Sequence, residues 1–143
     1  MANMNQEIGY LLKHAQQLLR TALDNSLRAL NLSMAQYAAL NALEQTPNAS
    51  NAVLARACFV TPQTMIEILK GLESEGYITR RAHPEHGRII QTLLSSSGQE
   101  KLSLAHSLVL GIQDRMTAGM PQSEREQFVL LLEACCKNLE QAS

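Results

Sequence analysis

The sequence predicts a mainly helical protein of about six helices, with one β-hairpin between the fourth helix and the fifth. Apolar residues recur at helical spacing through most of the chain, whereas residues 77–93 are rich in β-branched side chains and are divided by a segment that contains proline and glycine. The 143 residues are 45% hydrophobic and 17% charged, which is enough apolar material for one compact core and excludes intrinsic disorder.

The first expected helix spans residues 5–30. At the usual rise per residue this helix would be about 40 Å long. That length is more than a chain of this size needs for its own core. We therefore expect part of it to pack against another partner. Its apolar residues follow the spacing of one helical face: Ile8, Leu11, Leu12, Ala15, Leu18, Leu19, Ala22 and Leu23.

Two shorter helices are expected next. Ser33 and Gln36 have the spacing of a capping box, which opens a helix that residues 46–48 end. A short third helix fits residues 50–58. Tyr37, Leu40 and Leu43 lie on the inner face of the first of these helices. The apolar residues of the second are Val53, Leu54, Ala57 and Cys58.

Thr61 and Pro62 begin the fourth expected helix, because threonine is a favoured N-cap and proline at the first helical position loses no hydrogen bond. Gly76 can adopt a positive φ just past its end. The buried stripe of this helix consists of Met65, Ile68, Leu69 and Leu72. The opposite face carries Gln63, Glu67, Lys70 and Ser74.

The expected hairpin consists of strands at 77–82 and 89–93. Its tip between the strands ends in Arg88, so the tip is basic. From Arg56 to Arg88 the chain holds five Lys and Arg residues and four Asp and Glu residues, a balance of +1 within a protein of net charge −1. Affinity for DNA would therefore come from the placement of these cations and not from overall charge.

Two further helices are expected beyond the hairpin. Apolar residues step by three and four after Gly98, and a capping box formed by Ser123 and Glu126 opens the last helix. Too little else in the chain covers the apolar faces of the terminal helices, so we expect them to join two copies. The inward residues are Leu102, Ala105, Val109, Ile112 and Met116 in the fifth helix, and Phe128, Leu131, Leu132, Cys135 and Leu139 in the last.

This order of elements is that of a winged helix-turn-helix, with the hairpin as the wing. We expect residues 1–32 to form an N-terminal dimerisation helix, residues 33–96 a DNA-binding lobe, and residues 97–143 the C-terminal dimerisation helices. The recognition helix would then lie at residues 61–75 in the major groove.

The residue types suit DNA recognition. Small hydrogen-bonding side chains at the start of the recognition helix can reach base edges, and cations can hold the phosphates or, at the wing tip, enter the minor groove. Lys70 has the alternative of pairing with Glu67 one turn earlier. The candidate DNA-binding residues are Thr61, Pro62, Gln63, Thr64, Glu67, Lys70, Arg56, Arg80 and Arg88.

Three segments give the sequence a more specific resemblance: residues 54–61 (LARACFVT), residues 69–80 (LKGLESEGYITR), and a wing that ends in Arg88 and is followed by LSSSG. Over residues 30–100 the chain resembles the MarR family of bacterial transcription regulators. The resemblance implies a homodimer that binds a pseudo-palindromic operator on double-stranded DNA. It also implies release of the operator when a small, often aromatic, ligand or an oxidant acts, and we expect a repressor.

The chain also departs from that family's pattern. Glu67 and Lys70 stand in the reverse order of the usual basic and acidic pair, and the wing reads His86-Gly87-Arg88 where Asp-Arg-Arg is common. We therefore expect a changed operator and a weaker grip that depends less on salt. The alternative is a winged-helix dimer that binds a protein or a ligand and has little affinity for DNA.

An aromatic effector needs polar or aromatic side chains between the dimerisation helices and the DNA-binding lobe. Tyr10, His14 and Tyr37 are the candidates. The spacing of the four histidines and three cysteines predicts no metal site, and no cofactor is expected. The chain also lacks the nucleotide-binding, nucleophile-elbow and zinc-protease motifs, so we do not expect an enzyme.

The composition limits the cellular setting. The longest apolar run, residues 128–132, is far shorter than the roughly 18 residues of a membrane span, and residues 1–7 lack the basic and apolar regions expected of a signal peptide. Two of the three cysteines are adjacent, which indicates free thiols and no disulfide framework. We expect a cytoplasmic protein that does not contact membranes.

Overall fold

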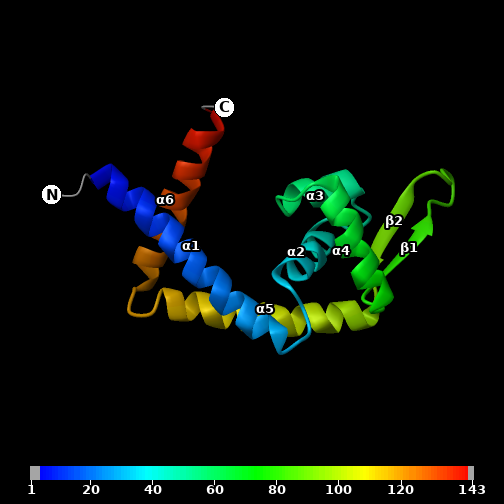
Figure 1. The fold of residues 1–143 in the computed structure, drawn as a ribbon, viewed down its shortest axis with the longest axis horizontal. Coiled ribbons are helices and arrows are strands. Elements are labelled where there is room, and N and C mark those ends of the chain that lie inside the picture. The colour runs from blue at the N-terminus through cyan, green and yellow to red at the C-terminus, as the bar shows by residue number, and fades with distance from the viewer. Residues whose placement is uncertain (1–3, 142–143) are drawn as a thin grey trace.

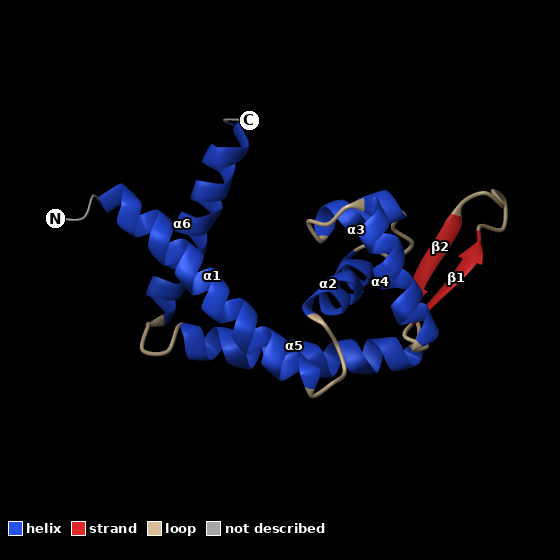
Figure 2. Cartoon of the chain, in the orientation of Figure 1, coloured by secondary structure: helices blue, strands red, loops and turns tan. Residues whose placement is uncertain are grey.

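The computed structural model describes residues 4–141, with side chains from residue 7 onward. The described chain contains six α-helices and one antiparallel pair of strands, which confirms the predicted mainly helical class (Figures 1 and 2). In chain order the elements are α1 (Met4–Arg28), α2 (Met34–Gln45), α3 (Asn51–Ala57), α4 (Pro62–Ser74), β1 (Ile78–Ala82), β2 (Ile90–Leu94), α5 (Ser96–Met116) and α6 (Gln122–Gln141).

The molecule has two regions. Helices α2, α3 and α4 and the hairpin form a lobe at one end, and α5 runs beneath this lobe toward α6 (Figure 1). The second region, which we call the arms, consists of α1, the far half of α5, and α6. Helix α1 packs against α5, and α5 in turn contacts α2 and β2, so α5 connects the two regions.

Hydroxyl side chains start four of the helices, largely as predicted. Ser33 forms the expected capping box with Gln36, while Ser50 and Thr61 cap α3 and α4. Two predicted starts are wrong. Helix α5 begins earlier than expected because Ser95 is its N-cap, and Gly98 lies within its first turn. Helix α6 begins at Gln122, so Ser123 lies inside the helix and does not form the expected capping box with Glu126.

Three helices end in the same hydrogen-bonded turn, which places one residue in the left-handed region. That residue is Asn31 after α1, Phe59 after α3 and Gly76 after α4, with φ values of 57°, 57° and 80°. After α3, the amides of Phe59 and Val60 donate to the carbonyls of Arg56 and Ala55, the pattern of a Schellman motif. Glycine and asparagine are usual at this position, whereas phenylalanine costs about 1 kcal/mol there.

The hydrophobic core lies in the lobe and beneath it. Helices α2 to α4 supply its centre, α1 contributes Leu23 and Leu27, and α5 contributes Leu102, Ala105 and Val109. Helix α6 has no buried residue. The prediction that its apolar face is inward is therefore wrong for a single chain, because no described part of one copy covers it. The exposed residues include Phe128, Leu131, Leu132, Cys135 and Leu139.

The hairpin is fixed to the rest of the lobe at its base. Strands β1 and β2 pair from Ile78 with Leu94 to Ala82 with Ile90. The hydroxyls of Ser95 and Ser97 both donate to the carbonyl of Gly76, at 2.6 and 3.0 Å. Gly98 packs so closely against Tyr77 that a Cβ there would overlap the Tyr77 carbonyl. These contacts set the direction of the wing relative to α4 and α5.

Within residues 4–141, no single helix has the length and hydropathy to cross a membrane. Helices α3 and α4 satisfy those criteria only when they are taken together. The angle between them is 101°.

Candidate DNA-binding surface and effector cleft

Helix α4 presents its first turn to solvent. The Thr61 hydroxyl accepts the amide of Thr64 at 3.1 Å and donates to the Thr64 hydroxyl at 2.9 Å, so Thr61 holds the start of the helix. Pro62 follows at the first helical position, and its carbonyl accepts the side-chain amide of Asn51 from α3 at 3.2 Å. This arrangement leaves Gln63 and the outer side of Thr64 exposed to solvent, where they are not needed to stabilise the fold.

The outer face of α4 is polar and fully separated from its buried stripe. Met65, Leu69 and Leu72 are buried beneath it, as the sequence predicted. Glu67 and Lys70 are exposed on the outside, and the ion pairs found in the described part of the chain do not include either residue. The side chains on this face are thus available to an external partner.

The predicted cations lie on three different elements of the lobe. Arg56 is exposed on α3, Arg88 is exposed at the tip of the wing, and Arg80 is half-buried on β1. The Nε atom of Arg80 is buried without a hydrogen-bond partner in the structure. Turning the Arg80 guanidinium outward toward a phosphate would therefore break no hydrogen bond at that nitrogen.

The wing tip is organised by a histidine for which the sequence predicted no role. The Nδ1 atom of His83 accepts the amides of Glu85 and His86 at 3.0 and 3.2 Å. The imidazole therefore serves the turn in the way that an Asp or Asn side chain often does. This turn places Arg88 at the outer end of the hairpin. Among the described residues, no group of three or more potential metal ligands comes together.

A polar network that sequence reasoning missed joins α2 to α5. The Tyr37 hydroxyl lies 2.9 Å from Nδ1 of His106, and His106 Nε2 lies 3.0 Å from a Glu44 oxygen. The other Glu44 oxygen accepts the side-chain amide of Gln99 at 2.7 Å. The Gln99 and His106 hydrogen bonds lower the pKa of Glu44, while burial and then the Glu44 charge raise the pKa of Tyr37. Residues 62 positions apart cannot be paired from one sequence.

Tyr37 also lines a cleft of about 340 Å³ between α2 and α3. Its walls are mostly apolar, and the polar lining residues include Asn41 and Gln45. Tyr10 and His14 lie elsewhere: their rings face each other at 5.7 Å on α1, and neither lines this cleft. One chain therefore does not bring the three predicted effector residues together.

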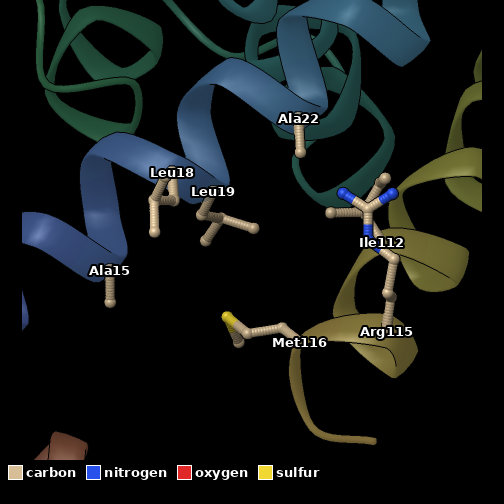
Figure 3. Close-up of a pocket in the computed structure, with 7 residues that line it drawn as sticks. All are labelled: Ala15, Leu18, Leu19, Ala22, Ile112, Arg115 and Met116. Atoms are coloured by element: carbon tan, nitrogen blue, oxygen red, sulfur yellow. The ribbon is translucent and has the colours of Figure 1, made fainter.

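The arms expose apolar side chains on every helix. The exposed fraction is 59% for Leu11 on α1, 59% for Leu110 on α5 and 64% for Leu130 on α6. Between α1 and α5 lies a hollow of about 250 Å³, into which Leu19 and Met116 project (Figure 3). An open apolar hollow beside exposed apolar faces is typical of a surface that another protein covers.

The three cysteines are free. Cys58 is half-buried at the end of α3, where burial raises the pKa of its thiol and so disfavours the reactive thiolate. Cys135 and Cys136 are exposed on α6. Packing of Cys135 in the core, which the sequence favoured, is therefore wrong for one chain.

The α2–α4 helices, the exposed start of α4 and the adjacent hairpin define a winged helix-turn-helix DNA-binding protein. A sequence model of the MarR family matches residues 30–89. The HTH-type transcriptional repressor Rv2887 of Mycobacterium tuberculosis is 32% identical over 126 residues, which cover 88% of this chain and 91% of that repressor. The chain therefore belongs to the MarR family of transcription regulators.

Solved structures agree with this assignment. The chain is similar to Mycobacterium tuberculosis Rv2887 in complex with DNA, with a TM-score of 0.75, 30% identity, and coverage of 89% of this chain and 95% of that one. It is also similar to Rv2887 in complex with salicylic acid, with a TM-score of 0.75, 31% identity, and coverage of 89% and 94%. CouR from Rhodococcus jostii RHA1 shares the fold, with a TM-score of 0.81, 20% identity, and coverage of 94% and 95%.

Proposed function

We propose that this chain is a homodimeric, ligand-responsive repressor that binds a pseudo-palindromic operator on double-stranded DNA. The observation that carries the proposal is the exposed polar face of α4, held by a capped N-terminus and flanked by the exposed Arg88 of the wing tip. The similarity to the repressor Rv2887, whose structure has been solved in complex with DNA, also supports the proposal. The protein would act in the cytoplasm, and the proposal assigns it no catalytic activity.

In this proposal, Gln63 and Thr64 read base edges in the major groove, while Thr61 and Pro62 fix the start of the helix. The phosphate contacts come from Lys70, Arg56 and Arg80, and Arg88 enters the adjacent minor groove. Glu67 lies on the same face of α4, and its negative charge repels nearby phosphates. It therefore restricts which base-pair steps α4 can contact. These roles are assigned from position, exposure and charge.

A second copy would cover the arms. Residues 1–32 and 97–143 would form the dimer, and residues 33–96 would bind DNA. The exposed leucines of α1, α5 and α6, with the hollow between α1 and α5, supply the apolar surface that a stable homodimer buries. Two-fold symmetry would then place the two α4 helices about 34 Å apart, one turn of the duplex.

We propose that the effector is a small aromatic acid. The cleft lined by Tyr37 is larger than one aromatic ring requires, and it lies between α2, which bears the Tyr37–His106 contact to α5, and α3, which contacts α4. Filling it would shift the spacing of these helices and so change the population that fits the operator. Tyr10 and His14 remain predicted effector residues without a shared cleft in one chain.

The test is a titration of DNA with the purified protein. A labelled duplex selected by the protein from a random pool should bind saturably, more tightly at low salt than at high salt, and salicylate should weaken that binding. A protein that retains no duplex even at low salt would instead be a winged-helix module for a protein or ligand. The acidic Glu67 in the recognition helix and the net charge of −1 are the features that favour this second function.

A further inference from the structure

We propose that Phe59 is a specificity-determining contact of this DNA-binding surface, where its ring meets the 5-methyl group of a thymine at the edge of the major groove. This inference rests on the DNA-binding function proposed above. It concerns the turn between α3 and α4, which the predicted contact residues did not include.

The exposure of Phe59 is the first observation. Its side chain is 96% exposed, the highest value among the large apolar residues with described side chains, and the next is Leu139 at 73%. The arms display their apolar residues in long faces that a second copy can cover. Phe59 instead stands on a tight turn, two residues before the N-cap of α4.

The second observation is a comparison within the chain. The same left-handed turn ends α1, α3 and α4, and it holds Asn31 and Gly76 at two of the three sites. These residues adopt a positive φ readily, while a bulky residue does not. The end of α3 therefore explains the left-handed turn, but it does not explain an exposed phenylalanine ring at this site. A role outside the fold accounts for the ring.

The position of Phe59 selects DNA as the partner. A protein interface needs a broad apolar patch, but the other large exposed apolar residues of the lobe are elsewhere: Val53 lines the α2–α3 cleft, and Ile89 and Ile90 lie on the wing. The nearest functional surface is the start of α4, with Thr61 and Gln63. A single aromatic ring beside a recognition helix can contact a thymine methyl group, which is readable only in the major groove.

The experiment combines protein variants with modified DNA. The duplex is one that the wild-type protein selects from a random pool, and each thymine is replaced in turn by uracil, which lacks only the 5-methyl group. We expect one uracil position in each half-site to weaken wild-type binding about fourfold, the effect of leaving one methyl group unburied. Phe59→Gly removes the ring from both copies of the dimer, so it should bind the unmodified duplex about sixteenfold more weakly and be insensitive to uracil at that position.

Two further variants separate recognition from folding. Phe59→Asn should behave like Phe59→Gly, whereas Phe59→Tyr keeps the ring and should keep the uracil sensitivity. The thermal midpoint of Phe59→Gly should be equal to or above that of the wild type, because glycine relieves the strained turn.

Three results would overturn the inference. The first is wild-type affinity in Phe59→Gly. The second is weaker binding by Phe59→Gly that has no coupling to any uracil position, which would indicate a sugar contact. The third is a lower thermal midpoint, which would show that the ring serves the fold. A wild-type protein that selects no duplex overturns the proposed function itself, which distinguishes that failure from the failure of Phe59 alone.

Discussion

The lobe and the arms of this molecule use apolar residues in opposite ways. The largest fully buried side chains, such as Leu40, Met65 and Leu69, lie in the lobe or in the parts of α1 and α5 directly beneath it. The first half of α1 and all of α6 have no buried side chain among the described residues. The lobe is thus complete in one chain, while the arms are complete only when a second copy covers them.

The difference shows which properties each region controls. Substitutions in the lobe core act on the free energy of unfolding of the chain itself. Substitutions on the arms act on association, and through association on DNA binding, because a dimer presents two recognition helices at once. The two regions can therefore be perturbed separately.

The largest expected effect is the loss of the dimer. Leu131→Asp places a charge on the exposed apolar face of α6, where dimerisation would bury it without a partner. We expect a monomer in sedimentation experiments. Operator affinity should fall about a thousandfold, or about 4 kcal/mol, because the second half-site no longer binds intramolecularly. Helicity should change little.

Gln141→Asp is the matched control, because it adds the same charge at an exposed polar position of the same helix, more than two turns away from Leu131. It should remain dimeric with unchanged operator affinity. A dimeric Leu131→Asp variant would place the interface outside the α6 face.

The lobe core provides the opposite case. Leu69→Ala removes a side chain that is only 1% exposed on the inner face of α4. We expect a loss of about 3 kcal/mol in the free energy of unfolding, from lost burial and the cavity left behind. Chemical denaturation at a fixed protein concentration measures it. Leu130→Ala, on the exposed face of α6, should leave the unfolding of a monomeric background unchanged, and an equal loss there would contradict the division between lobe and arms.

A substitution in the wing changes the surface of the lobe and not its core. Arg88→Ala should weaken operator binding by about 2 kcal/mol, lower the slope of log K against log salt by about 2 because both copies lose a cation, and leave the dimer intact. Fluorescence anisotropy at several salt concentrations measures both quantities. Arg20→Ala removes an exposed cation from α1 and serves as the control. Equal salt slopes in the two variants would remove Arg88 from the interface.

Local sequence patterns predicted much of the fold because their causes are local. The N-caps at Ser33 and Thr61, the positive φ of Gly76 and the buried stripe through Met65 and Leu69 each depend on residues a few positions apart. The same reasoning misplaced the start of α6, because the spacing of Ser123 and Glu126 fits a capping box equally well inside a helix.

The rest depends on contacts that no local pattern encodes. His106 approaches Tyr37 and Glu44 only after α5 packs beneath α2. The candidate DNA-binding residues were found from type and spacing, and their roles stay predictions. Phe59 had a visible signal in the sequence: an aromatic residue where the turn after a short helix favours glycine or asparagine.

The smallest expected effect lies at the contact between the lobe and α5, the helix that connects the two regions. Glu44 joins α2 to α5 there. Its pKa is lowered in the folded protein, so the unfolded chain binds the proton more readily and stability rises with pH through this range. The contribution should be fully present above about pH 4.3, the ordinary glutamate pKa, and should be lost as pH falls through the lower folded value. Glu44→Gln should therefore reduce the free energy of unfolding by about 0.5 kcal/mol at neutral pH, a modest value because the pair is partly exposed. Urea denaturation across this pH range should show the difference from wild type disappearing in acid. Glu100→Gln, which removes an exposed carboxylate from α5, is the control for the loss of one charge. If the free energy of unfolding of Glu44→Gln differed from that of the wild type by the same amount at every pH, Glu44 would act by shape and not by charge. The contact between α2 and α5 would then be held by packing alone.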